Sequence, residues 1–170
     1  METKTIISSS ERQTLYNYLR DSRDLKDVFL QFLLETGARV SESFTATHRD
    51  NQVYIKGLKS SLDRTVTISD NLKAKLNATG GLNPRLISQG KSQRRTLTRH
   101  WHSVSVKVLG RRVKLHALRH AAFSDLYKAS KDLMLVKQWA GHKSVNSTLV
   151  YLHLDNLEQA NTLARSLLSE

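Results

Sequence analysis

The chain contains no cysteine in its 170 residues. Disulfide frameworks, thiolate nucleophiles and cysteine zinc sites are therefore excluded. Long apolar runs are absent as well. None approaches the roughly 20 residues that a bilayer-spanning helix needs, and residues 1–10 lack the apolar core of a signal peptide. We therefore expect a cytoplasmic protein with no membrane partner.

Acidic residues are missing from a long central stretch. Residues 71–124 contain no Asp or Glu but 12 Lys and Arg, in a chain whose formal net charge is +12 and whose pI is near 10.2. A solvated basic face normally mixes both signs of charge, and an acidic membrane is the weaker alternative partner, so this stretch favours nucleic acid. The residues that we expect to contact it are Lys56, Arg64, Arg94, Arg95, Arg99, Arg111, Arg112, Lys114 and Lys143.

Proline is nearly absent, and its one copy, Pro84, lies in the segment 79–84, which we predict to be a loop. Apolar periodicity and end signals predict helices over much of the chain, with Ser10 as the first cap and Gly37 as the end of the second helix. The expected helices are 10–19, 25–35, 41–46, 69–76, 98–109, 116–129, 132–140, 144–152 and 154–168, and the expected strands are 52–55 and 64–68. At this length we expect one α+β domain, mainly helical, with a small antiparallel sheet.

Four short motifs follow one another along the chain. In order, they are Thr36 to Glu42 (TGARVSE), Lys59 ahead of a strand that begins at Arg64 (RTVT), His116 to His120 (HALRH), and Gly141-His142 with Tyr151 nine residues beyond His142. Each has an ordinary explanation when taken singly. A lone tyrosine usually lies at the edge of a core, a lone histidine is a cap, and Arg39 could be a cation near a helix end. Their order and spacing together indicate a tyrosine that attacks a phosphodiester.

A tyrosine hydroxyl needs help to attack a phosphate. Its pKa is near 10, so about 0.1% is phenolate at pH 7, and the attack adds negative charge around phosphorus. Arginine offers a flat fork of donors that stays charged, and histidine, with its pKa near neutrality, can move protons. The catalytic candidates are therefore Arg39, Arg119, His116, His142 and Tyr151.

The four motifs resemble those of the tyrosine recombinases, the phage integrase family. The first is similar to the family's arginine box, the third to its His-x-x-Arg-His box, and the fourth to its Gly-His signature with the nine-residue step to the nucleophile. Lys59 stands ahead of Arg64 at the distance that the family's catalytic lysine keeps from its Arg-x-Val-Pro strand. Thr67 replaces the proline of that strand, a change that affects packing more than chemistry. The resemblance covers residues 36–151.

The resemblance implies a mainly helical recombinase catalytic domain that breaks and rejoins DNA through a covalent 3′-phosphotyrosine. It implies no requirement for ATP, metal or another cofactor. The implied roles are phosphate binding by Arg39 and Arg119, general acid catalysis by Lys59 with Lys56 as the alternative, acceptance of the Tyr151 proton by His116, hydrogen bonding of the phosphate by His142, and support from Glu42 and His120.

The family usually has an N-terminal core-binding domain that closes around DNA, but here the arginine box already stands at residue 36. We therefore expect a single catalytic domain over residues 1–170, either excised from a longer enzyme or naturally alone. Residues 152–170 carry an apolar stripe and are expected to dock on a neighbouring subunit or to pack on their own domain. The expected partners are double-stranded DNA, further copies in a homotetramer on DNA, and accessory DNA-bending proteins. The free chain is expected to be a monomer or weak oligomer.

The sequence leaves several functional alternatives open. The resemblance suggests a mobile genetic element of viral or plasmid origin, with the enzyme at the nucleoid or in the host of a phage. A type IB topoisomerase-like activity would use nearly the same residues on one DNA molecule at a time. A non-catalytic DNA-binding regulator could keep the fold alone. The complete residue set argues against the regulator, and the short chain with integrase-like motifs favours recombination over relaxation.

Overall fold

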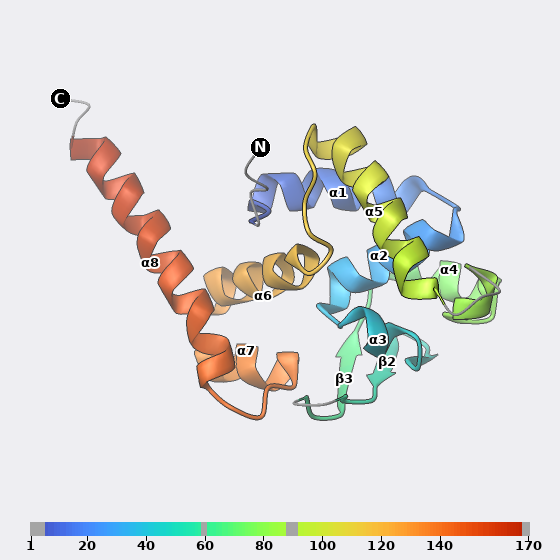
Figure 1. Cartoon of the computed structure of the whole chain (residues 1–170). Helices are drawn as coiled ribbons and strands as arrows, with labels where there is room; N and C mark the ends of the chain where they lie inside the picture. The colour runs from blue at the N-terminus through green and yellow to red at the C-terminus, as the bar shows by residue number, and fades with distance from the viewer. Residues whose placement is uncertain (1–5, 59–60, 88–91, 168–170) are drawn as a thin grey trace.

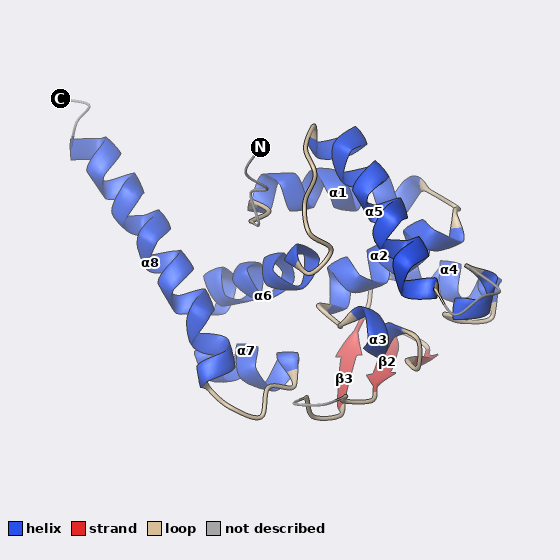
Figure 2. Cartoon of the chain, viewed as in Figure 1, coloured by secondary structure: helices blue, strands red, loops and turns tan. Residues whose placement is uncertain are grey.

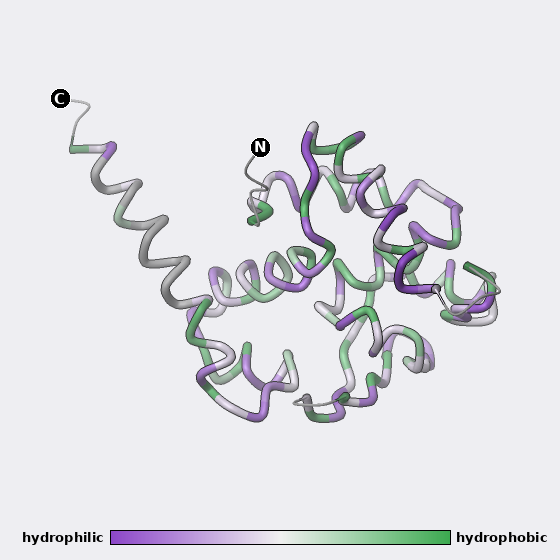
Figure 3. Tube along the Cα trace, in the orientation of Figure 1, coloured by the Kyte–Doolittle hydropathy of each residue, from purple (hydrophilic) through white to green (hydrophobic). Residues whose placement is uncertain are grey.

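The computed structural model describes residues 6–58, 61–87 and 92–167 of the chain (Figure 1). Within them the fold is mainly helical with one three-stranded antiparallel sheet, as the sequence predicts (Figure 2). Hydrophobic and hydrophilic residues alternate along α6 (Figure 3). In the described part of the chain, no helix is long and apolar enough to cross a membrane.

The core forms around α2 (Leu25–Thr36), which is buried on nearly all sides. α1 (Ser9–Asp21) and α5 (Gln93–Leu109) pack near it, and the indole N–H of Trp101 on α5 donates to the carbonyl of Val113 (2.7 Å). α1 begins before its predicted start because Ser8 and Glu11 form a capping box: the Ser8 side chain accepts the backbone N–H of Glu11, and the Glu11 carboxylate accepts that of Ser8.

The sheet is a short meander beside α3 (Val40–Ser43). β2 (Gln52–Ile55) and β3 (Arg64–Thr67) pair antiparallel, as predicted, with Val53 opposite Val66 on the buried face. The sequence did not predict β1 (Thr47–Arg49), which pairs with β2. Its polar residues carry no hydrophobic alternation, so pairing with β2 defines this strand.

Two short helices connect the sheet to α5. α4 (Asp70–Thr79) is capped by the Ser69 side chain and ends at Gly80 in the left-handed conformation. A 3₁₀ turn, η1 (Pro84–Leu86), then follows. α5 begins at Gln93, five residues before the predicted start.

The remaining helices form the second half of the molecule. α6 (Ala117–Ser130) and α7 (Leu133–Ala140) lie close to their predicted ranges, and a second buried cluster gathers around Phe123. α8 (Asn146–Leu167) is one continuous helix where two were predicted, since no Gly or Pro interrupts it. Its start packs on α6 and α7, and its far end extends away from the rest of the molecule (Figure 1).

Candidate active site

The centre of the site is the buried carboxylate of Glu42. α2 ends at Gly37 with a positive φ of 61°, and a Cβ there would lie 2.6 Å from the ring of Phe123. The chain then places Arg39 at the N-cap of α3, with Glu42 one turn later and fully buried. Glu42 accepts the backbone N–H of Arg39 (2.8 Å) and its Nη1–H (3.1 Å). The first motif thus folds into a single turn that ties its arginine to its carboxylate.

Arg119 on α6 reaches the same carboxylate. Its side chain is 3% exposed, and its Nη1 donates to the carbonyl of Gly37 (2.6 Å) and lies 3.8 Å from Glu42 Oε2. The guanidinium carbon lies 4.5 Å from the centre of the Phe123 ring. Burial and the charge of Arg39 lower the pKa of Arg119 to about 10, so it remains charged at pH 7.

His142 is held between Arg119 and Thr148. Its Nε2 lies 3.0 Å from Arg119 Nη2, and its Nδ1 lies 2.9 Å from the Thr148 hydroxyl oxygen. Because arginine can only donate, Nε2 is the acceptor, and in the neutral ring Nδ1 then carries the proton and donates to Thr148. These partners indicate a neutral imidazole of fixed tautomer that helps to orient Arg119.

Tyr151 lies near the start of α8 and is 2% exposed. Its ring centre is 5.6 Å from that of Phe123 and 5.8 Å from that of His120. The His120 ring in turn lies 4.8 Å from that of His116, which stands at the N-cap of α6. The first turn of α6 therefore presents both histidines on the side of the candidate nucleophile.

The pKa values of the site's histidines and of Tyr151 are shifted, and those of the histidines are not near neutrality as the sequence predicts. Burial and the charges of Arg119 and Arg39 lower the pKa of His142 to about 4. The pKa of His116, which is an exposed residue, is also lowered to about 4 by desolvation and by the charges of His120 and Arg119. Burial raises the pKa of Tyr151 to about 12, although the two arginines oppose it. At pH 7 His116, His142 and Tyr151 are therefore neutral, and the charged groups of the centre are its arginines and Glu42.

A comparison with protein-family models identifies the relationship. The model of the phage integrase family matches residues 5–158. The chain belongs to this family. A probable integrase/recombinase protein of Methanocaldococcus jannaschii is 30% identical over 184 residues, which cover 96% of this chain and 52% of that protein. The chain thus spans about half the length of this curated relative.

Solved structures of phage integrase relatives share the fold. The XerH site-specific recombinase bound to a palindromic difH substrate has a TM-score of 0.73 at 19% identity, covering 96% of this chain and 54% of that one. The catalytic domain of bacteriophage HP1 integrase has a TM-score of 0.61 at 20% identity, with 95% of each chain covered. The described helices and sheet therefore form an integrase-type catalytic domain fold.

Ser61 is a site residue of this integrase domain that the sequence did not single out. Arg39 Nη1 donates to its hydroxyl, it forms an isolated β-bridge with His142, and the next residue, Leu62, donates its N–H to the carbonyl of Gly141 (2.7 Å). The end of the β2–β3 connection is thus docked beside Arg39 and His142. No motif marks this serine, so no sequence signal could have found it. Lys59, the predicted general acid, lies outside the described residues.

Arg64 is buried, and the prediction that it contacts DNA is replaced by an internal role. Its side chain is 4% exposed, and its Nη2 donates to Glu42 Oε2 (3.0 Å). The reason is the period of the strand: Arg64 is two residues from Val66 on β3, so both side chains point to the covered face.

Basic residues on α5 line an open groove of about 760 Å³. Its lining residues are Ser92, Arg94, Arg95, Thr98, Arg99 and His102. Four other predicted DNA contacts are exposed, namely Lys56, Arg112, Lys114 and Lys143. Arg111 differs, because its guanidinium binds both carboxylate oxygens of Glu11 (2.8 and 2.9 Å) and the carbonyl of Ile6 (2.9 Å). These contacts anchor α1, and the predicted DNA contact of Arg111 stays a prediction.

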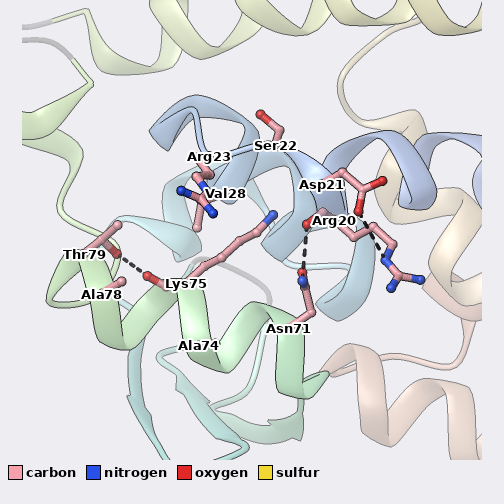
Figure 4. Close-up of a pocket in the computed structure, with 10 residues that line it drawn as sticks. All are labelled: Arg20, Asp21, Ser22, Arg23, Val28, Asn71, Ala74, Lys75, Ala78 and Thr79. Atoms are coloured by element: carbon pink, nitrogen blue, oxygen red, sulfur yellow. Dashed lines mark hydrogen bonds and ion pairs between the residues drawn. The ribbon is translucent and has the colours of Figure 1, made fainter.

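A second hollow, of about 570 Å³, lies between the α1–α2 connection and α4 (Figure 4). Its Lys75 ammonium donates to the carbonyl of Leu19 (2.7 Å) and to the amide oxygen of Gln31 (2.9 Å), and Arg20 pairs with Asp21 (3.7 Å). The two Lys75 contacts fasten α4 to α1 and α2. Among the described residues, no group of three or more histidine or acidic side chains is placed to hold a metal ion.

Proposed function

We propose that this domain cuts and rejoins DNA as a site-specific recombinase, through a 3′-phosphotyrosine on Tyr151. The observation that carries the proposal is the convergence of Arg39, Arg119 and His142 on one buried centre, with Tyr151 packed beside it. Membership of the phage integrase family and the DNA substrate bound by a solved relative support it.

In the proposed cleavage step, the Tyr151 oxygen forms a bond to phosphorus while the bond from phosphorus to the 5′ oxygen breaks. The phosphate becomes five-coordinate and gains negative charge, and Arg39 and Arg119 would hold its non-bridging oxygens with charged forks of donors. The Tyr151 proton passes to a base, and the departing 5′ oxygen takes a proton from an acid. In rejoining, a 5′ hydroxyl displaces Tyr151, so the bond energy is kept and no ATP is needed.

The proton acceptor that we assign to Tyr151 is His116, whose neutral ring contacts the His120 ring beside the tyrosine. A base is needed because a pKa of about 12 leaves a phenolate fraction on the order of 10⁻⁵ at pH 7. His142 would act first by orienting Arg119, since its Nε2 accepts from that arginine. It could donate to a phosphate only after Nε2 gains a proton. The general acid stays assigned to Lys59 by the family pattern.

Double-stranded DNA is the proposed substrate, and the α5 groove is the proposed surface for its backbone. The exposed guanidinium groups of Arg94, Arg95 and Arg99 suit phosphates, which supply affinity without reading sequence. We further propose that copies of the chain assemble into a homotetramer on DNA, with the C-terminal part of α8 contacting a neighbour and with accessory DNA-bending proteins assisting.

A covalent-capture experiment tests this function. The protein is incubated with a pool of randomised duplexes, each carrying one nick, so that the cleaved end diffuses away and the protein stays linked to DNA. We expect a denaturation-resistant adduct whose sequences share a common motif. Tyr151→Phe should abolish the adduct because it removes the attacking oxygen. Tyr127→Phe, which changes a buried tyrosine on α6, is the matched control and should retain it.

The other functions correspond to distinct results. If no DNA in the pool is captured, the regulator is favoured and the proposal fails. If adducts form without a shared sequence and the protein relaxes a supercoiled plasmid without exchanging strands, the topoisomerase-like activity is correct instead.

A further inference from the structure

We propose that Arg64 is a positioning residue of the site, which holds the Glu42 carboxylate so that Arg39 and Arg119 are free to bind the phosphate. This inference rests on the proposed function. Its tests include one readout that does not depend on DNA cleavage.

The geometry places Arg64 and both catalytic arginines on one carboxylate. Arg64 Nη2 lies 3.0 Å from Glu42 Oε2, the same oxygen that accepts the backbone N–H of Arg39 and lies 3.8 Å from Arg119 Nη1. The Arg64 and Glu42 side chains are 4% and 0% exposed, so their pairing is little screened by water. Without Arg64, the Glu42 carboxylate would lack one of its partners. It would then attract the guanidinium groups of Arg39 and Arg119 more closely, away from an incoming phosphate.

The balance of charge supports this role. Three guanidinium groups face one carboxylate, which leaves two positive charges in excess, and the neighbouring histidines and Tyr151 are neutral at pH 7. A phosphodiester carries one negative charge and gains a second as the tyrosine oxygen attacks. With Arg64 present, the charge of the centre matches that of the transition state, and such preorganised charge is usually the largest catalytic contribution.

The packing around Arg64 also indicates a dedicated place for it. Its Nε and Nη1 are buried with no hydrogen-bond partner among the described residues, a costly state for an arginine that served only to join two elements. Gly141 leaves room for this side chain: a Cβ there would lie 3.2 Å from Arg64 Cδ and 3.3 Å from Nη1. The Gly141-His142 turn therefore accommodates the Arg64 side chain because its first residue has no Cβ.

The test compares Arg64→Gln and Arg64→Lys with the wild-type chain. At saturating DNA, we expect Arg64→Gln to slow covalent cleavage by about a hundredfold, the usual loss for one preorganised donor, while DNA affinity and its salt dependence stay nearly unchanged. Arg64→Lys should recover part of the rate because it restores the charge. The control Arg20→Gln, at an exposed pair with Asp21 on α1, should change neither the rate at saturation nor the affinity.

A second readout is the titration of His142, followed by NMR on the free protein. Arg64 is one of the charges that hold the pKa of His142 near 4, so Arg64→Gln should raise that pKa. Circular dichroism tests whether each variant is folded. If Arg64→Gln unfolds, the same comparison is made with Arg64→Lys, which should cleave more slowly than wild type at unchanged affinity.

Three results would overturn the inference. One is a variant that cleaves at the wild-type rate. Another is a loss of cleavage rate that disappears at saturating DNA, together with a smaller salt slope of DNA binding. That result would make Arg64 a DNA contact. The third is an unchanged His142 titration in Arg64→Gln. If wild type itself forms no adduct, the proposed function fails, and the His142 titration still decides whether Arg64 sets the charge of this centre.

Discussion

Two features of the structure require glycine at position 141. Its φ is 66°, a left-handed conformation that other residues adopt at a cost, and an added Cβ would lie 2.7 Å from the carbonyl oxygen of Leu62. That carbonyl belongs to the segment docked beside Arg39 and His142. The glycine of the Gly-His motif therefore keeps the β2–β3 connection and the turn before α8 in contact.

We predict that Gly141→Ala destabilises the protein by several kcal/mol in urea unfolding. Gly110→Ala is the matched control, because Gly110 has nearly the same φ (69°) but no atom within 4 Å of its Cβ position. The control should lose about 1 kcal/mol, the strain of the backbone alone. Equal losses in the two variants would mean that the close approach to Leu62 relaxes freely.

The residues of the candidate site were predictable from sequence only where a motif marks them. Arg39 and Arg119 both reach Glu42, and His142 contacts Arg119, because each motif fixes a local turn that aims its side chain. Arg64 was predicted to contact DNA but is buried, and Ser61 was not singled out by the sequence. The direction of a strand residue depends on which face is covered, and a docked loop depends on contacts distant in sequence.

At the scale of elements, α5 provides a testable DNA surface. We predict that Arg95→Gln and Arg99→Gln each reduce the salt slope of DNA binding by about 1 and weaken binding to all sequences alike, because each removes one phosphate contact. Binding is measured by fluorescence anisotropy at several salt concentrations. Arg20→Gln is the control, since Arg20 already pairs with Asp21 on α1. An unchanged slope in both α5 variants would place the DNA elsewhere.

Apolar periodicity predicted the presence of most helices and strands. The ends of these elements depend on capping residues, which the sequence indicates less clearly. The Ser8 capping box moved the start of α1, and Gly37 ended α2 as predicted. β1 escaped prediction because its three polar residues become a strand by pairing with β2. Two helices were predicted in the region of α8, but with no Gly or Pro to interrupt it the chain continues as one helix.

At the scale of the whole molecule, the far end of α8 extends beyond the packed helices (Figure 1). A projecting segment of this length is marginal as an isolated helix in water, so a neighbouring copy bound to DNA would stabilise it. We predict that ending the chain after Leu154 leaves a folded protein that still captures a nicked single site, because Tyr151 and its contacts on α6 remain. Light scattering of DNA complexes should then show fewer subunits, whereas ending the chain after Leu167 should not. Complexes of unchanged size after the longer deletion would assign this helix to its own domain.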